Sequence, residues 1–273
     1  MITTRVLVES LVRADGTVDA GELYAIAAIL GMTDQQVRLC IKRLVAEGRF
    51  THEGRGRRAL LRATAEVFNE VEFVRYAYRQ DQGLEPWDGR WRLVAFAIPE
   101  TARAARDSFR DAIVYLGGAF VQGGLYVTPN DWDDLIAVHR DRLGIGAGVT
   151  TLTTTDLCVG GERDPRRLAA ALWPLGEIAE RYVRLGERAR QLLESHAGLA
   201  RIELLAGTIE VAAQFTAAME PDPLLPPELL PRPWPGTEAR ALSARCFEAL
   251  RQRDGDDAPS RLYAIDSLGR HAG

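Results

Sequence analysis

Over the first 50 residues, apolar positions lie three and four residues apart, which is the period of an amphipathic helix. This pattern predicts helices over 5–12 and 22–30. Thr33 can cap a third helix, with Gln36 as the partner residue of a capping box. Gly48 is expected to end that helix, because glycine readily takes the left-handed conformation that closes a last helical turn.

Beyond the third helix the pattern changes to that of two short strands, 49–52 and 59–64. They are joined by 53–58, a glycine-containing tip rich in arginine. Helices followed by such a hairpin indicate a winged helix. The segment 65–80 is expected to form a linker helix, and 81–89, which contains glycine and proline, is expected to be a break.

Residues 90–157 alternate between strand and helix patterns. The first strand stops before Pro99 and is followed by an amphipathic helix. A hairpin is expected to turn at Gly123-Gly124, and Asn130 is expected to cap the next helix. A β-branched segment supplies a last strand. The order β-α-β-β-α-β is that of a ferredoxin-like domain.

Helical periodicity returns over 163–253, where the proline-rich loop 222–236 interrupts it. The predicted fold class is therefore α+β and multidomain. We expect an N-terminal winged helix with its linker helix at 1–80, a ferredoxin-like domain at 90–160, and a helical C-terminal domain at 163–273.

The composition narrows the class of protein. At 273 residues, with 47% apolar and 26% charged residues, the chain suits two or three soluble globular domains. No apolar run reaches the roughly 18–20 residues of a membrane helix, and the N-terminus lacks a signal-like apolar core. Cys40, Cys158 and Cys246 are scattered and odd in number. We therefore expect reduced cysteines in a cytoplasmic protein that is not bound to a membrane.

Charge is distributed unevenly along the chain. The formal net charge is −4, whereas 33–62 holds eight cationic residues against Asp34, Glu47 and Glu53. A concentrated basic element in an acidic protein usually contacts a polyanion. We therefore predict that the winged helix binds double-stranded DNA. The eight cationic residues are Arg38, Lys42, Arg43, Arg49, Arg55, Arg57, Arg58 and Arg62.

The third helix and the hairpin tip are the expected DNA contacts. A stripe with Arg38, Leu39 and Lys42 lies opposite the apolar side of the helix, at 100° per residue. Glutamine and arginine there can pair with base edges in the major groove, and arginines at the tip can approach phosphates or the minor groove. A solvated helix face is the alternative for the stripe alone, and the sequence leaves open which arginines read bases. The predicted DNA-binding residues are Gln35, Gln36, Arg38, Lys42, Arg43, Arg55, Arg57 and Arg58.

Segments outside the winged helix resemble the PaaX family of bacterial transcription regulators, named for the phenylacetic acid degradation repressor. The first runs from Trp91-Arg92-Leu93-Val94 to Ile98-Pro99-Glu100 and precedes the helix with Arg106 and Arg110. The second is GAFVQGGLYVTP at 118–129. The third is DPLLP at 222–226, followed by WPG at 234–236. With the winged helix, the resemblance covers nearly the whole chain.

The resemblance implies a homodimeric repressor of an aromatic or phenylacetate-type catabolic pathway. Its central domain would be similar to Cas2 and would serve dimerisation, and its helical domain would bind an effector. That effector would be an acyl-CoA, typically phenylacetyl-CoA, which releases the protein from its operator. One departure is that 213–217, just before DPLLP, lacks the His and Arg that family members often carry.

Arginines on two predicted helices are candidates for binding the phosphates of CoA, because guanidinium groups match phosphate geometry. The alternatives are an exposed helix side or a dimer brace for the arginines, and the protein core for the tyrosine. The candidate effector-binding residues are Arg106, Arg110, Arg181, Tyr182 and Arg184.

Catalysis has little support in the sequence. It has no G-x-S-x-G, P-loop, dinucleotide-binding or H-E-x-x-H motif, and its histidines have no ligand spacing. Cas2-type enzymes use an aspartate at the end of the first strand, whereas here Ala97-Ile98-Pro99 is followed by the single carboxylate Glu100. We therefore expect no enzyme activity, catalytic residue, cofactor or metal. The alternatives left open are an enzyme acting through the Cas2-like domain and a DNA-binding dimer without effector.

Overall fold

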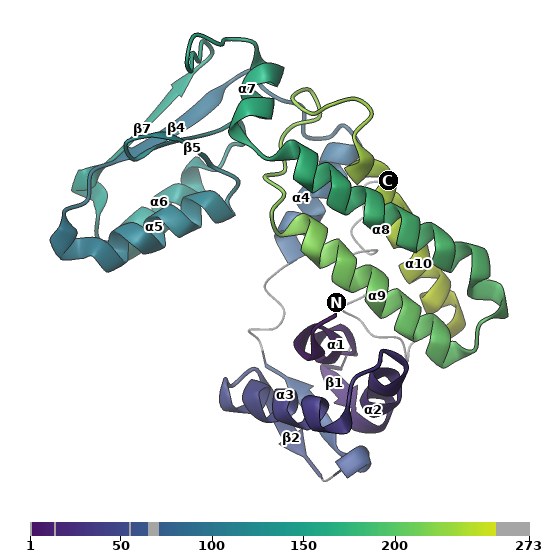
Figure 1. Ribbon diagram of the computed structural model, residues 1–273. Coiled ribbons are helices and arrows are strands. Elements are labelled where there is room, and N and C mark those ends of the chain that lie inside the picture. Colours follow the sequence, from purple (N-terminus) through teal and green to yellow (C-terminus); the bar gives the residue numbers. More distant parts are fainter. Residues whose placement is uncertain (1, 14, 55, 65–70, 255–273) are drawn as a thin grey trace. The chain divides into compact units, whose positions relative to one another are not determined.

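The computed structural model describes residues 2–13, 15–54, 56–64 and 71–254 (Figure 1). Contacts between them define two compact units. The first unit draws on 1–78, 180–219 and 235–273, and the second on 79–179 and 220–234. The division into three domains along the sequence stays a prediction.

The N-terminal part of the first unit is a winged helix. Its helices are α1 (Thr4–Ser10), α2 (Ala20–Ile29) and α3 (Asp34–Ala46). Its antiparallel sheet has the order β1-β3-β2, with β1 (Thr17–Asp19), β2 (Phe50–Glu53) and β3 (Leu60–Ala63). The predicted hairpin is β2 and β3, joined through η1 (Gly56–Arg58). The sequence pattern missed β1, because three residues are too few to show alternation.

Both ends of α3 follow from local sequence. The Thr33 hydroxyl accepts from the Gln36 backbone N–H at 3.3 Å, and Oε1 of Gln36 accepts from the Thr33 N–H at 2.7 Å. This reciprocal pair is the predicted capping box. Gly48, with φ 72°, follows the last turn as expected.

Long helices complete the first unit. They are α4 (Val71–Asp81), whose last residues lie in the second unit, α8 (Leu175–Ser195) from Glu180 onward, α9 (Arg201–Met219) and α10 (Pro235–Asp254), with η5 (His196–Gly198) between α8 and α9. Helix α9 packs against α10 and also against α1 and α2. The Glu22 carboxylate on α2 accepts from Arg13 at 3.1 Å and from Arg201 on α9 at 2.8 Å.

Helix α9 is, within the described part of the chain, the one helix long and apolar enough to cross a membrane by length and composition. Ten of its residues are buried, among them Leu205, Ile209 and Phe215. Since its neighbours are helices of the same unit, burial in the core accounts for its apolar character.

The second unit contains an antiparallel sheet of order β5-β6-β4-β7, with α5 and α6 along one face (Figure 1). Phe96 on the sheet packs against Phe109 on α5, with ring centroids 5.4 Å apart. This arrangement confirms the predicted β-α-β-β-α-β order. Its elements are β4 (Trp91–Phe96), η3 (Glu100–Ala102), α5 (Arg103–Tyr115), β5 (Ala119–Gln122), β6 (Leu125–Thr128), α6 (Asp133–Leu143), η4 (Gly146–Gly148) and β7 (Val149–Thr154).

The hairpin between β5 and β6 turns at Gly123-Gly124, as predicted. Both glycines have positive φ, 51° and 88°, which suits the tight turn of a two-residue hairpin loop. A side chain at Gly124 would also lie 2.7 Å from the carbonyl oxygen of Phe96. The turn therefore requires glycine both for its conformation and for close packing on β4.

The helical periodicity predicted over 163–253 is also interrupted near residue 173. Helix α7 (Pro165–Leu172) ends before Trp173-Pro174, and α8 begins at Leu175. Proline cannot supply the N–H that a continuous helix needs. Helix α7 belongs to the second unit, where Trp173 stacks on Trp91 at 6.4 Å and donates to the Gly117 carbonyl at 2.9 Å.

Candidate nucleic-acid interface

Helix α3 presents a cationic face to solvent. Gln35, Arg38, Leu39, Lys42 and Arg43 are all exposed. Arg38 is 70% exposed and lies 3.8 Å from Asp34, too far for a hydrogen bond. In the residues that the structure describes, Lys42 and Arg43 have no carboxylate partner. Their charges are therefore available to an anion.

The tip of the wing carries a further exposed cation. Arg58 is exposed at the end of η1 and has no ion pair within the described ranges. Gly54 and Gly56 have φ of 85° and 63°, so the tip needs glycine to turn. Arg55 lies outside the described residues, as does the side chain of Arg57, and their predicted roles stay predictions.

Other cations of this segment are paired within the protein. Arg49 donates to Glu9 on α1 at 2.9 Å, and Arg62 donates to Glu53 across the hairpin at 3.3 Å. Glu47 accepts from Arg5 at 3.3 Å. Among the described side chains of this segment, the charges without a carboxylate partner are thus on α3 and Arg58, because Arg49 and Arg62 are paired within the fold.

A groove of about 430 Å³ lies between α3 and the wing. Its apolar lining comes from Ala20, Tyr24, Ile41 and Val45. Val45 is 36% exposed. The groove is also lined by the cations Arg38 and Lys42 and, from the wing, by His52. Sequence reasoning missed His52, whose position beside α3 follows only from the pairing of β2 with β3.

The candidate effector arginines on α5 are paired with carboxylates. Arg106 donates to Glu100 at 2.7 Å, and Arg110 donates to Asp111 at 2.8 Å. Asp107 lies about midway, 3.5 Å from each of the two guanidinium groups. The hydrogen bond to Glu100 raises the pKa of Arg106 above its usual value. A phosphate would have to displace these carboxylates.

The other effector candidates belong to the first unit. Tyr182 is buried, and its hydroxyl accepts from Arg240 at 2.9 Å and donates to the Met219 sulfur at 3.2 Å. Arg181 donates to the Ala217 carbonyl at 2.9 Å. Arg184 is 62% exposed and lies 3.9 Å from Glu180. Of these three, Arg184 is the most available to a ligand.

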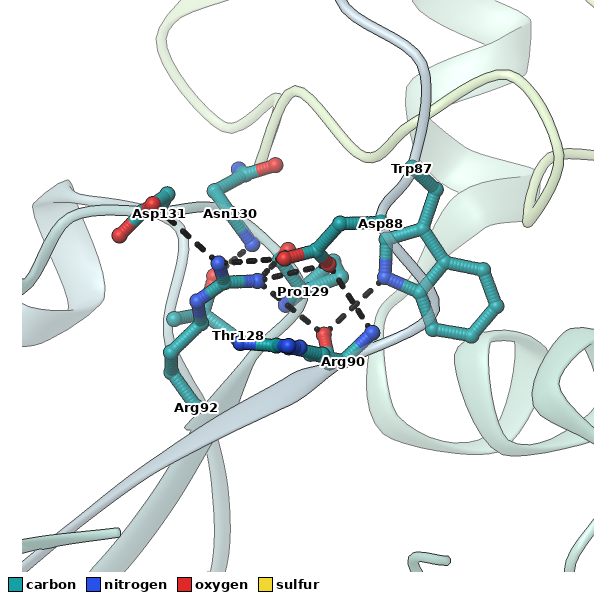
Figure 2. A network of polar contacts seen from close by, with 8 residues as sticks. All are labelled: Trp87, Asp88, Arg90, Arg92, Thr128, Pro129, Asn130 and Asp131. Carbon is teal, nitrogen blue, oxygen red and sulfur yellow. Dashed lines mark hydrogen bonds and ion pairs between the residues drawn. The ribbon is translucent and has the colours of Figure 1, made fainter. Parts of the chain in front are cut away.

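Figure 2 shows a polar network at the corner of the second unit, which sequence reasoning did not find. Arg92, 9% exposed, donates through two nitrogens to both carboxylate oxygens of Asp88, at 2.9 and 2.7 Å. It also donates to the Pro129 carbonyl at 3.2 Å and lies 3.3 Å from Asp131. The hydrogen bond from Arg92 lowers the pKa of Asp88. This network joins the start of β4 to the segment before α6.

Asn130 has a different role from the predicted one. Helix α6 begins at Asp133 without a side-chain cap, and Asn130 is buried. Its side-chain NH₂ donates to the Pro223 carbonyl at 3.0 Å, and Gln80 donates to the Leu224 carbonyl at 2.8 Å. The DPLLP segment is therefore held by buried amides, with Leu224 at φ 51°. The side chain of Asn130 thus pairs with a backbone carbonyl 93 positions away in the chain and does not cap α6.

The described residues hold no group of three or more His, Cys, Asp and Glu side chains that could bind a metal ion. Glu100, which lies in η3 beyond the end of β4, accepts a hydrogen bond from Arg106.

Comparisons with known proteins cover nearly the whole chain. Residues 1–67 match a PaaX-like protein family, 84–169 match the PaaX protein central Cas2-like domain, and 173–256 match the PaaX-like protein C-terminal domain. Among curated proteins, none matches significantly.

A solved structure has a similar fold. It is the uncharacterized protein Rv0674 from Mycobacterium tuberculosis, 24% identical, with a TM-score of 0.53 over 88% of this chain and 91% of that chain. The winged helix, the Cas2-like sheet and the helical segments thus occur in the order that these domain matches require. The chain belongs to the PaaX family of transcription regulators.

Proposed function

We propose that this regulator binds double-stranded DNA through α3 and the wing. The observation that carries the proposal is the exposed face of α3, where Lys42 and Arg43 lack carboxylate partners in the described part of an otherwise acidic chain. Arg58 on the wing is a further exposed cation. Uncompensated cations on a capped helix are what a DNA phosphate backbone requires.

In this arrangement some side chains would contact bases and others would contact phosphates. Gln35 and Arg38, near the N-terminus of α3, are positioned to reach base edges in the major groove. Lys42, Arg43 and Arg58 would neutralise phosphates and set the register of the helix on the duplex. Two copies, paired through the Cas2-like domain, would read two half-sites of an operator.

The regulated pathway would be one of aromatic or phenylacetate-type catabolism, with the protein acting as repressor. An acyl-CoA would bind more tightly to the conformation of the protein that binds DNA less well, and would shift the population towards that conformation. Phenylacetyl-CoA is the first such ligand to test. Family membership supports this effector class. Arg106 and Arg110 already have close carboxylate partners, whereas Arg184 lies 3.9 Å from Glu180. Arg184 is therefore the more available candidate for contacting the CoA phosphates.

The test of DNA binding is a salt titration of affinity for the DNA upstream of the protein's own gene. Replacing Arg43 and Arg58 by Ala should reduce the slope of log K against log salt by about two, since each lost phosphate contact contributes about 0.9. Arg140→Ala is the matched control, because Arg140 is already paired with Asp141 at 2.8 Å. An unchanged slope in the double variant would exclude the face from the interface.

The effector is tested separately. The same assay is repeated with phenylacetyl-CoA, other acyl-CoA thioesters and free aromatic acids. Release of DNA by one thioester and not by its free acid supports an acyl-CoA effector. Binding that none of them changes would indicate a DNA-binding dimer without effector.

A further inference from the structure

The groove between α3 and the wing is lined by an exposed histidine of β2, His52. Alternate residues of β2 face opposite sides of the wing. Phe50 is buried against the winged-helix core, and His52, two residues on, lies on the same side and lines the groove. Thr51 and Glu53 therefore face the other way, where Glu53 accepts from Arg62 at 3.3 Å.

The groups that face His52 carry positive charge or none. Arg38 and Lys42 come from α3, and Tyr24, the other titratable lining residue, comes from α2. Gly56 supplies backbone from the wing, and no carboxylate belongs to the described lining. Asp34 lies 3.8 Å from Arg38, one turn before the groove along α3. The groove is thus complementary to an anion.

We propose that this groove receives one phosphodiester of the DNA backbone and that His52 is a proton-linked ligand of that phosphate. The inference rests on the proposed DNA binding and adds to it a site and a pH dependence. The groove volume, about 430 Å³, falls within the roughly 300–1,000 Å³ of sites that accept small ligands. A phosphate with its sugar can therefore place its charge beside Lys42 and His52 and its sugar carbons on Ile41 and Val45.

The proton linkage follows from the charges. Histidine changes its charge between about pH 5 and pH 8. A phosphate in the groove would attract the protonated imidazole of His52, so binding is expected to be strongest at the acid end of this range and to weaken as the pH rises. One pKa unit of difference corresponds to a tenfold change in affinity.

The experiment measures the dissociation constant for a fluorescent duplex of the upstream region, at constant ionic strength, between about pH 5.5 and pH 8. For the unaltered protein we expect the constant to rise roughly three- to tenfold over this range. His52→Gln should bind with a constant that does not change with pH. His52→Lys, which stays charged, should bind tightly across the whole range.

Controls identify the responsible group. His139 and His196 are the other histidines of the described residues, and their Gln variants should keep the pH dependence. Circular dichroism checks that each variant is folded. The salt slope of the unaltered protein should exceed that of His52→Gln by about one at low pH and match it at pH 8.

Each other outcome has a definite meaning. Salt-dependent binding that is unaffected by pH leaves DNA binding standing and overturns the role of His52. A pH dependence that survives in His52→Gln overturns it as well. If inorganic phosphate displaced DNA from the unaltered protein and not from His52→Gln at matched ionic strength, the groove would be a site for free anions. Failure to bind any duplex would overturn both proposals.

Discussion

Two arginine-containing helices of equal length, α3 and α5, differ in what surrounds their charges. Each has 13 residues. On α3, Lys42 and Arg43 have no carboxylate partner within the described residues. On α5, Arg103, Arg106 and Arg110 lie among Glu100, Asp107 and Asp111. The number of arginines on a helix therefore does not predict anion binding, because carboxylates of the same protein can already be paired with these arginines.

Arg92 is a third case, in which the cation is both paired and buried. It is buried and held by Asp88, and its charge serves the corner of the second unit shown in Figure 2. Exposed pairs such as those on α5 contribute little to stability, whereas breaking a buried pair leaves a charge in a poor environment. We therefore expect mutations to have different effects at the unpaired cations of α3, at the exposed ion pairs of α5 and at the buried Arg92.

The largest effect is expected from reversing charge on α3. Lys42→Glu with Arg43→Glu should weaken DNA binding roughly 100-fold or more, because two phosphate contacts are replaced by repulsion. Fluorescence anisotropy at fixed salt measures it. Arg103→Glu with Arg106→Glu changes the net charge equally and should alter DNA affinity less than about threefold. Equal losses in the two double variants would show that overall charge, and not the α3 face, governs binding.

Arg38 should affect sequence preference more than general affinity. Arg38→Ala should cost about 1–3 kcal/mol at particular base pairs, the value of a lost bidentate contact. A panel of operator duplexes with single base changes measures this. Uniform weakening across the panel would assign Arg38 to the phosphates instead.

Removing the partner of Arg92 should affect stability and not DNA affinity. Asp88→Asn should lower the free energy of unfolding of the second unit by about 1–2 kcal/mol at pH 7. All five tryptophans of the chain lie in that unit, so tryptophan fluorescence in urea reports on it. Asp134→Asn, at an exposed carboxylate without an ion pair in the described chain, is the control and should have little effect.

The same pair predicts a pH dependence. The pKa of Asp88 is lowered in the folded state, so its contribution is fully present above the ordinary aspartate value of about 3.9. The contribution is lost as the pH falls through the lowered pKa. The difference in stability between the unaltered protein and Asp88→Asn should therefore shrink below about pH 4. A constant difference down to low pH would contradict the role of the charged carboxylate.

The smallest effect on anion binding is expected from removing two of the carboxylates that are paired with the arginines of α5. Asp107→Asn with Asp111→Asn should strengthen retention on heparin modestly, with a gain in affinity of about two- to threefold, because exposed pairs are weak. No change at all would mean that Glu100 alone keeps these arginines occupied.

Much of the fold was predictable where the determinants are local. The capping box of Thr33 and Gln36 and the glycine turn of the β5–β6 hairpin involve residues within a few positions of each other. Strand β1 was not predictable, because its three residues form a strand only by pairing with β3, more than 40 positions later. Asn130 was assigned to the nearest helix, whereas its partner is the Pro223 carbonyl 93 positions away.

The sequence alone determined the order of elements, the exposed stripe of α3 and the family motifs, since these depend on periodicity and on residues that are neighbours in the chain. Only the tertiary structure decided which cations remain available. Arg49 is removed from the candidate surface by Glu9, 40 positions earlier, and His52 is brought into the α3 groove by the wing. Electrostatic interactions act through space, so the partner of a charge is known only when the chain has folded.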